Sequence, residues 1–134
     1  MILLVEDSED DVFLMERALQ KASIDHPMHV ATDGRQALEY LQGIGKYADR
    51  NAYPIPALIF LDLKLPFVHG FQVLEWINGQ PSLKHVPVVV LSSSPEEKDR
   101  DKAKQLGAQV FLVKPPTREM LRQVFQSLPG DRLG

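Results

Sequence analysis

The chain has 134 residues, of which 44% are hydrophobic and 25% are charged, and it contains no cysteine. These values indicate one soluble globular domain, and they exclude collagen, low-complexity disorder, disulfides and thiolate metal sites. The 15 basic and 18 acidic side chains give a net charge of −3, so nothing favours direct nucleic-acid binding. The apolar runs are far shorter than the ~20 residues of a membrane-spanning helix, and the absence of cysteine suits a cytoplasmic location.

The first predicted element is a strand over Ile2–Val5, a short run of apolar residues. A helix follows over residues 9–22, where apolar side chains recur at helical spacing. Ser8 and Asp11, three residues apart, resemble a capping box at the start of this helix. We interpret Asp10 and Asp11 as acids that the positive end of the helix stabilises.

The same alternation of strand and helix continues along the chain. Further strands are predicted at residues 28–32, 57–61, 88–91 and 110–113. Helices are predicted after each of them, around 37–41 and over 71–77, 95–106 and 117–128. Before the third strand, residues 43–56 contain two glycines and two prolines, which predicts a long loop.

Five strands that alternate with five helices are typical of α/β domains with a parallel sheet. The strands are apolar throughout rather than alternately apolar and polar, which indicates that helices cover both faces of the sheet. We therefore predict an open, doubly wound, five-stranded parallel sheet of the α/β class. Residues 1–128 are expected to form this one domain, and residues 129–134 a short C-terminal tail.

Polar side chains follow the strands at the ends where open α/β sheets place their functional sites. Glu6 and Asp7 come after the first strand, and Asp62 comes after the third. Ser92 follows the fourth strand and Lys114 follows the fifth. Because parallel strands share one carboxyl edge, these five side chains are predicted to converge.

The converging residues indicate chemistry on phosphate. Clustered carboxylates repel one another and need a cation, and their hard oxygen atoms suit Mg²⁺. A carboxylate such as Asp62 beside Mg²⁺ can attack phosphorus and form an aspartyl phosphate. Lys114 would neutralise charge on the transferred group, and the Ser92 hydroxyl would bind one of its oxygen atoms.

Four segments, in this order, resemble the receiver domains of bacterial two-component response regulators: LLVEDSEDD, LIFLDLKLPFVHG, PVVVLSS and VFLVKPPT. The resemblance covers about residues 2–128 and implies the flavodoxin-like strand order 2-1-3-4-5. It also implies a single-domain response regulator that receives a phosphoryl group from a sensor histidine kinase or a phosphotransfer protein. The 43–56 loop, with Tyr47 and Tyr53, is similar to that of receivers serving phytochrome-type histidine kinases.

The resemblance implies a role for each carboxylate of the site. Asp62 would be the phospho-acceptor, and Asp7 would bind Mg²⁺ directly. Glu6 would act on the metal mainly through bound water. The backbone carbonyl of Lys64 would supply a further metal ligand.

Three further positions match residues that bind or sense the phosphoryl group in the family. Lys114 would bind the phosphoryl group, and its bond to Pro115 would be cis. Ser92 occupies the position of the switch hydroxyl. Phe111 occupies the position of the switch aromatic residue, commonly tyrosine, and would act through packing alone because it has no hydroxyl.

The lifetime of the acyl phosphate is also predicted from position. Lys64 and Ser94 flank the approach of water to a phosphoryl group on Asp62. Neither is a carboxylate or an amide, the groups best able to orient the attacking water. Lys64 could lie across the phosphoryl oxygens and obstruct water, so slow autodephosphorylation is expected. The alternative that the sequence leaves open is that Lys64 points into solvent and does not affect the lifetime.

Two protein partners are expected on different surfaces. The histidine kinase would contact the first helix near Val12 and Phe13, and Phe67 in the loop after the third strand. A downstream protein would bind the face of the fourth helix, fifth strand and fifth helix after phosphorylation. A homodimer through the fourth-helix face is an alternative that the sequence leaves open. Ser93 is interpreted as structural and Trp76 as a packing residue of the third helix. The four histidines have no metal-ligand spacing and are interpreted as surface or turn residues: His26, His29, His69 and His85.

Other functions with related folds fit less well. A phosphatase of the haloacid dehalogenase type needs a second aspartate two residues after the first, where this chain has Lys64. A flavodoxin needs a Ser/Thr-rich phosphate loop after the first strand, where this chain has EDSEDD. A P-loop NTPase is excluded because no G-x-x-x-x-G-K-[ST] segment occurs.

Overall fold

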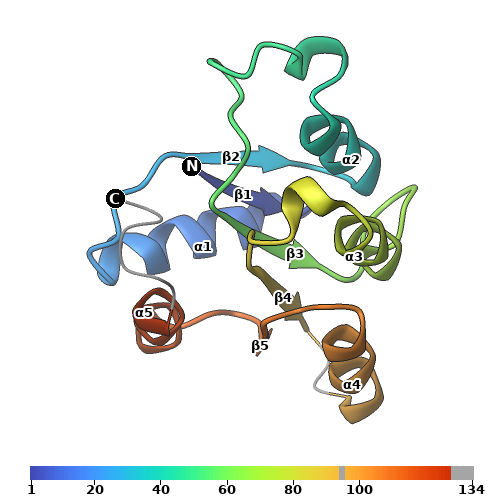
Figure 1. Cartoon of the computed structure of the whole chain (residues 1–134). Helices are drawn as coiled ribbons and strands as arrows, with labels where there is room; N and C mark the ends of the chain where they lie inside the picture. The colour runs from blue at the N-terminus through green and yellow to red at the C-terminus, as the bar shows by residue number, and fades with distance from the viewer. Residues whose placement is uncertain (94–95, 128–134) are drawn as a thin grey trace.

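A five-stranded parallel sheet lies at the centre of the computed structural model, which describes residues 1–93 and 96–127 (Figure 1). Its strands are β1 (Ile2–Val5), β2 (Met28–Ala31), β3 (Leu58–Asp62), β4 (Val88–Ser92) and β5 (Val110–Val113). Their order is β2-β1-β3-β4-β5, which confirms the predicted fold class and the strand order. Ser94 and the 129–134 tail lie outside the described residues.

Helices cover both faces of the sheet. They are α1 (Glu9–Lys21), α2 (Gly34–Gln42), α3 (Gly70–Asn78), α4 (Glu97–Gln105) and α5 (Arg118–Ser127), with short 3-10 helices η1 (Gly45–Tyr47) and η2 (Pro81–Leu83) in the connections. Figure 1 shows α1 and α5 on one face and α2, α3 and α4 on the other. The predicted doubly wound arrangement is therefore confirmed.

Alternate residues of the strands face opposite helical layers. In β1, Ile2 and Leu4 pack with buried side chains of α1 and α5, whereas Leu3 and Val5 pack with those of α2, α3 and α4. Central strand β3 is buried along its whole length. Each fully buried aliphatic side chain contributes roughly 1.5–3 kcal/mol, which explains why the strands are apolar on both faces.

Strands β3 and β4 extend one residue further than predicted. Asp62 pairs with Leu91, and Ser92 pairs with Val113, so the two polar residues end the strands rather than follow them. Backbone pairing does not depend on side-chain polarity, and the ladder therefore continues past the apolar run. As a result, both side chains project from the rigid edge of the sheet.

The long connection between α2 and β3 is tied to α2 by one arginine. Arg50 donates hydrogen bonds to the carbonyl oxygens of Tyr40 (2.8 Å), Leu41 (2.8 Å) and Tyr53 (3.0 Å). The Tyr40 hydroxyl in turn donates to the carbonyl oxygen of Pro54 (2.9 Å). The connection is therefore an ordered part of the fold, although its sequence has no helical or strand period.

His29 on β2 lies among three tyrosines of α2 and the long connection, so its interpretation as a surface or turn residue is wrong. Its ring centroid is 4.9 Å from that of Tyr40, 5.7 Å from that of Tyr47 and 5.8 Å from that of Tyr53. The Nε2 atom of His29 is buried and has no hydrogen-bond partner among the described residues. An unsatisfied buried nitrogen destabilises the folded state.

Replacing His29 with phenylalanine is expected to raise the free energy of unfolding by about 1–2 kcal/mol, because the aromatic ring remains and the unsatisfied nitrogen is removed. Burial, followed by the positive charge of Lys46, lowers the pKa of His29. The unfolded chain, in which histidine has a pKa of about 6.5, therefore binds a proton more readily than the folded protein does. The free energy of unfolding falls as the pH drops below that value.

Urea unfolding at about pH 7.5 and about pH 5.5 measures this loss. The loss should be smaller in His29→Phe than in wild type. His26→Phe is the control and should keep the full loss, because its ring stacks on Phe125, away from the tyrosines. Equal pH dependence in wild type and His29→Phe would contradict the prediction.

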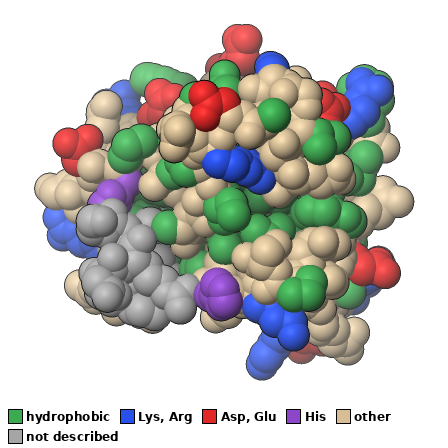
Figure 2. Space-filling model, turned by 45° about the horizontal axis from the view of Figure 1, so that its top comes forward, with side chains coloured by type: hydrophobic (Ala, Val, Ile, Leu, Met, Phe, Trp, Pro, Cys, Tyr) green, Lys and Arg blue, Asp and Glu red, His purple; other side chains and the backbone are tan. Residues whose placement is uncertain are grey.

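The face of the molecule in Figure 2 carries side chains of both charges. On the face seen in Figure 2, hydrophobic side chains gather in a band across the middle, and Lys and Arg side chains stand apart from one another.

None of the helices in residues 1–93 and 96–127 combines the length and the apolar character that crossing a bilayer requires.

Candidate functional site

Four strands bring the predicted polar residues to one edge of the sheet. Glu6 directly follows β1, Asp62 ends β3 and Ser92 ends β4. All three are nearly inaccessible to solvent, with exposed fractions of 2%, 4% and 4%. Asp7 is exposed, and Lys114 directly follows β5 with 13% of its side chain exposed. The backbone N–H of Lys114 donates to the carbonyl oxygen of Ser92 (2.8 Å), which joins the ends of β4 and β5.

Three carboxylates form a cluster that suits a divalent cation. One oxygen atom each from Glu6, Asp7 and Asp62 lies within 4.8 Å of the other two. Burial raises the pKa of Glu6 to about 7, and the nearby Asp62 carboxylate adds to the rise. Mg²⁺ binds a few carboxylate oxygens and keeps several waters, so these donors fit the predicted metal.

The Lys114 ammonium group donates a hydrogen bond to each of three carboxylates. Its Nζ atom lies 2.8 Å from Glu6 Oε1, 2.8 Å from Asp11 Oδ2 and 2.9 Å from Asp62 Oδ2. Burial alone would lower the pKa of Lys114, but the three hydrogen bonds outweigh burial and raise the pKa above its usual range. The lysine is therefore charged, and all three of its N–H donors are used.

Asp11 takes part in this arrangement, so its interpretation as a helix-start acid alone is wrong. Ser8 caps α1 as predicted, since its Oγ atom accepts from the N–H of Asp11 (3.3 Å). The reciprocal half of the capping box is missing, because the N–H of Ser8 donates to Glu6 Oε2 (3.3 Å) instead. An acid at the third position of a helix that begins beside a site is the signal that could have revealed Asp11.

Lys64 lies two residues after Asp62. Its N–H donates to Asp62 Oδ1 (3.2 Å), and its side chain is exposed. One oxygen atom of Asp62 therefore accepts from this N–H, and the other accepts from Lys114. The Lys114–Pro115 peptide bond is cis, as the resemblance implied.

Phe111 lies on β5, the strand that Lys114 directly follows. Its ring is half-buried and packs against the core between the sheet and α2, α3 and α4. The guanidinium carbon of Arg100, on α4, lies 5.1 Å from the ring centroid. Phe111 therefore contacts both the core and the Arg100 side chain of α4.

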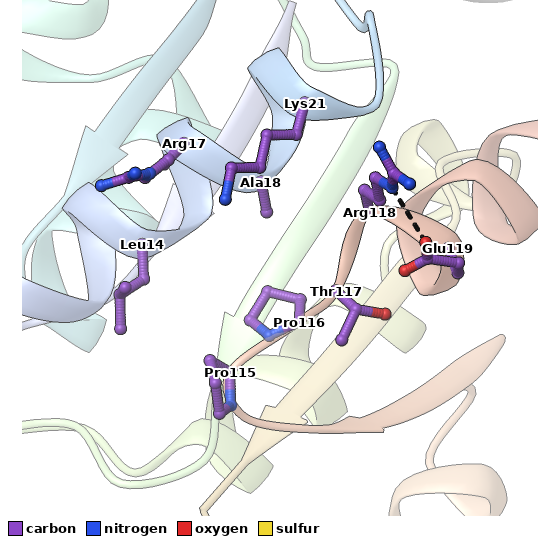
Figure 3. A pocket seen from close by; sticks show the side chains of 9 residues that line it. All are labelled: Leu14, Arg17, Ala18, Lys21, Pro115, Pro116, Thr117, Arg118 and Glu119. Atoms are coloured by element: carbon purple, nitrogen blue, oxygen red, sulfur yellow. Dashed lines mark hydrogen bonds and ion pairs between the residues drawn. The ribbon is translucent and has the colours of Figure 1, made fainter.

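A groove of about 530 Å³ runs beside the site, between α1 and the start of α5 (Figure 3). Its lining is mostly apolar and basic, with one hydroxyl and one acidic side chain: Leu14, Arg17, Ala18, Lys21, Pro115, Pro116, Thr117, Arg118 and Glu119. Leu14, Pro115 and Pro116 also line a small cavity that reaches Glu6 and Lys114. The groove and the carboxylate site are therefore adjoining.

Two phenylalanines named for partner binding are exposed. Phe13 on α1 is 51% exposed, and Phe67 after β3 is 73% exposed. Phe67 has a φ of +67°, an uncommon backbone conformation for a bulky residue. The Arg35 guanidinium carbon lies 4.2 Å from the Phe67 ring centroid and steadies the side chain.

Comparison with known proteins gives consistent matches. The model of the response regulator receiver domain matches residues 2–126. The chain is 38% identical over 130 residues to response regulator Rcp1 of Synechocystis sp.. The aligned residues cover 97% of this chain and 84% of Rcp1. The structure of Mn²⁺-bound Rcp1 matches with a TM-score of 0.77 and 38% identity, over 98% of this chain and 93% of that one.

Two further solved structures match. The bacteriophytochrome response regulator AtBRR has a TM-score of 0.83 and 42% identity, over 95% of this chain and 90% of that one. The phosphorylated cyanobacterial phytochrome response regulator RcpA has a TM-score of 0.78 and 37% identity, over 92% of this chain and 86% of that one. Together with the sheet order and the carboxylate–lysine site, these matches show that the chain belongs to the response regulator receiver domain family.

Proposed function

We propose that this response regulator accepts a phosphoryl group on Asp62 from a histidine kinase, with Mg²⁺ bound to the carboxylate cluster. The observation that carries the proposal is the hydrogen bond that Lys114 donates to buried Asp62. Asp62 clusters there with the carboxylates of Glu6 and Asp7. The phosphorylated structure of RcpA, a relative 37% identical to this chain, supports the reaction.

The transfer is a substitution at phosphorus. A carboxylate oxygen of Asp62 forms the new O–P bond, and the bond from phosphorus to the kinase histidine nitrogen breaks and leaves its electron pair on that nitrogen. The N–H of Lys64 and the ammonium of Lys114 hold the Asp62 carboxylate in one orientation before the reaction. Lys114 then donates to a phosphoryl oxygen and offsets part of its charge.

Metal binding would use the three carboxylates. Exposed Asp7 and buried Asp62 would bind Mg²⁺ directly, buried Glu6 would act through bound water, and the carbonyl of Lys64 would add a ligand. When bound, the ion supplies positive charge beside the phosphoryl oxygens. The Mn²⁺-bound structure of Rcp1 supports a divalent cation in this family.

Phosphorylation would change the face formed by α4, β5 and α5. A dianionic phosphoryl group on Asp62 would draw in the hydroxyl of Ser92 at the end of β4. Phe111 would then move by repacking, because its ring already contacts the core and Arg100. The free energy for the shift comes from phosphoryl contacts made in only one state. A downstream protein would bind the altered face.

The kinase partner would be of the phytochrome type, which the 42% identity to AtBRR supports. The groove between α1 and α5 would receive part of the kinase, because it adjoins the cavity that reaches Lys114. Phe13 and Phe67 would contact the kinase at the rim of the site, where both are exposed.

A slow loss of the phosphoryl group is part of the proposal. The exposed side chain of Lys64 can lie across the phosphoryl oxygens and obstruct an in-line water. Lys64→Asn should therefore shorten the lifetime. The second position named for this role, Ser94, lies outside the described residues.

Incubation with acetyl phosphate and Mg²⁺ tests the proposed function. Intact-mass measurement should show a gain of one phosphoryl group in the wild-type protein. Excess EDTA should abolish this gain, because Glu6, Asp7 and Asp62 then lack the cation that offsets their charge. No gain with Mg²⁺, or an undiminished rate in EDTA, would contradict the proposal.

A further inference from the structure

The hydrogen-bond donors of Lys114 are fully used before any phosphoryl group arrives. An ammonium group has three N–H donors and no acceptor. Each donor already has a carboxylate partner at 2.8 or 2.9 Å, namely Glu6, Asp11 or Asp62. A phosphoryl oxygen that binds Lys114 must therefore displace one of these carboxylates or share a donor with it.

The three carboxylates differ in how easily they can release the lysine. Glu6 is 2% exposed, and its buried carboxylate would lose its ion pair with Lys114, which is strongly unfavourable. Asp62 becomes the phosphorylated group itself, so its one donor stays with that group, and a second donor for the phosphoryl oxygens must come from Glu6 or Asp11. The side chain of Asp11 is 33% exposed, so water can take the place of Lys114 there. Asp11 is therefore the partner that exchanges at the smallest loss.

The side chain of Asp11 is not needed to cap α1. Ser8 Oγ accepts from the backbone N–H of Asp11, and the N–H of Ser8 is satisfied by Glu6. The Asp11 carboxylate makes one hydrogen bond within the described residues, and it accepts that bond from Lys114. Its placement therefore serves the lysine rather than the helix.

We infer that Asp11 is a positioning residue that holds Lys114 in the unphosphorylated protein and thereby weakens binding of a phosphoryl group, an inference that rests on the proposed function of Asp62. Two effects act in the same direction. Asp11 competes for an N–H donor, and its negative charge offsets the lysine charge that a phosphoryl group would otherwise receive. Asp11 thus sets the balance between the resting and phosphorylated states.

Beryllium trifluoride, an anion that mimics a phosphoryl group on an aspartate, provides a test that needs no kinase. Its affinity for the Mg²⁺-loaded full chain is measured by titration calorimetry. Asp11→Asn should bind it about tenfold more tightly than wild type, because a charge-assisted hydrogen bond that competes for Lys114 is weakened. The metal concentration is kept saturating for every variant.

Asp10→Asn is the matched control. Asp10 is exposed, lies in the same first turn of α1 and makes no salt bridge to Lys114. The substitution removes the same charge from the same end of the helix, so its affinity should change by less than about twofold. Asp11→Glu restores a carboxylate and should return the affinity toward the wild-type value, which a purely structural role would not predict.

Thermal unfolding of each variant checks that it is folded, and Asp11→Ser provides a second neutral substitution with the same expected gain in affinity. Equal affinity in Asp11→Asn and Asp10→Asn would overturn the inference. Weaker binding by Asp11→Asn would overturn it as well, because Asp11 would then assist the phosphoryl group. Failure of the wild type to bind the probe would instead contradict the proposed function of Asp62.

Discussion

Asp62→Asn is expected to abolish the gain of one phosphoryl group from acetyl phosphate and Mg²⁺. A neutral amide has no carboxylate oxygen able to form an acyl phosphate, although it keeps the shape of the side chain. Lys114 and Glu6 remain in the variant, but neither is expected to replace the missing nucleophile. Intact-mass measurement over time compares the variant with wild type.

The fold should survive this substitution. In the native site, Asp62 Oδ1 accepts from the N–H of Lys64 and Oδ2 accepts from Lys114. An asparagine has one oxygen atom, so one donor loses its partner, at about 1–3 kcal/mol. Removal of one clustered negative charge offsets part of this loss. Thermal unfolding should therefore show a folded variant.

Asp10→Asn provides the control for the loss of a carboxylate near the site. Asp10 is exposed on α1 and should leave phosphoryl incorporation unchanged. A mass gain in Asp62→Asn as large as in wild type would show that another residue is the acceptor. A loss in both variants would point to the charge of the region rather than to the nucleophile.

The sheet could be predicted because its strands carry a strong local signal. Each strand is a short apolar run, and burial on both faces makes that run continuous, as in β3 and β4. The last residue of these two strands was missed because Asp62 and Ser92 are polar, whereas the backbone ladder continues through them. Hydrophobic pattern therefore locates a strand better than it locates the end of the strand.

The carboxylate–lysine cluster could also be predicted, because parallel strands direct their carboxyl ends to one edge. That rule alone was enough to bring Glu6, Asp7, Asp62 and Lys114 together. It could not place Asp11, because the direction of a side chain in the first turn of a helix depends on its tertiary partners. Here the partner is Lys114, which lies 103 positions away in the sequence.

The environment of His29 was hidden for a similar reason. Its neighbours Tyr40, Tyr47 and Tyr53 come from α2 and the connection that follows it. Two of these tyrosines lie in a segment without a hydrophobic period, so no local pattern shows that they are packed. Long-range packing of an irregular segment is decided by contacts such as those of Arg50, which composition does not reveal.

Gly70→Ala is expected to lower the free energy of unfolding by about 3 kcal/mol, the upper end of the usual range for overpacking. Gly70 begins α3 and donates its N–H to the carbonyl oxygen of Leu63 (2.9 Å). A Cβ atom on Gly70 would lie against the carbonyl oxygen of Asp62 and 2.5 Å from the Cα atom of Leu63. These are backbone atoms at the end of central strand β3, so no flexible side chain can move aside.

The same substitution should slow phosphoryl incorporation, because the new methyl group presses on the backbone of Asp62. Gly79→Ala is the control: the nearest atoms to its Cβ, the carbonyl oxygens of Trp76 and Glu75, lie 3.5 and 3.7 Å away, and its φ is −85°. Alanine fits there and should change stability by less than about 1 kcal/mol. Urea unfolding of both variants measures the difference, and equal stabilities would show that α3 can move away from β3. In that case the position of Asp62 would not depend on the close approach of Gly70.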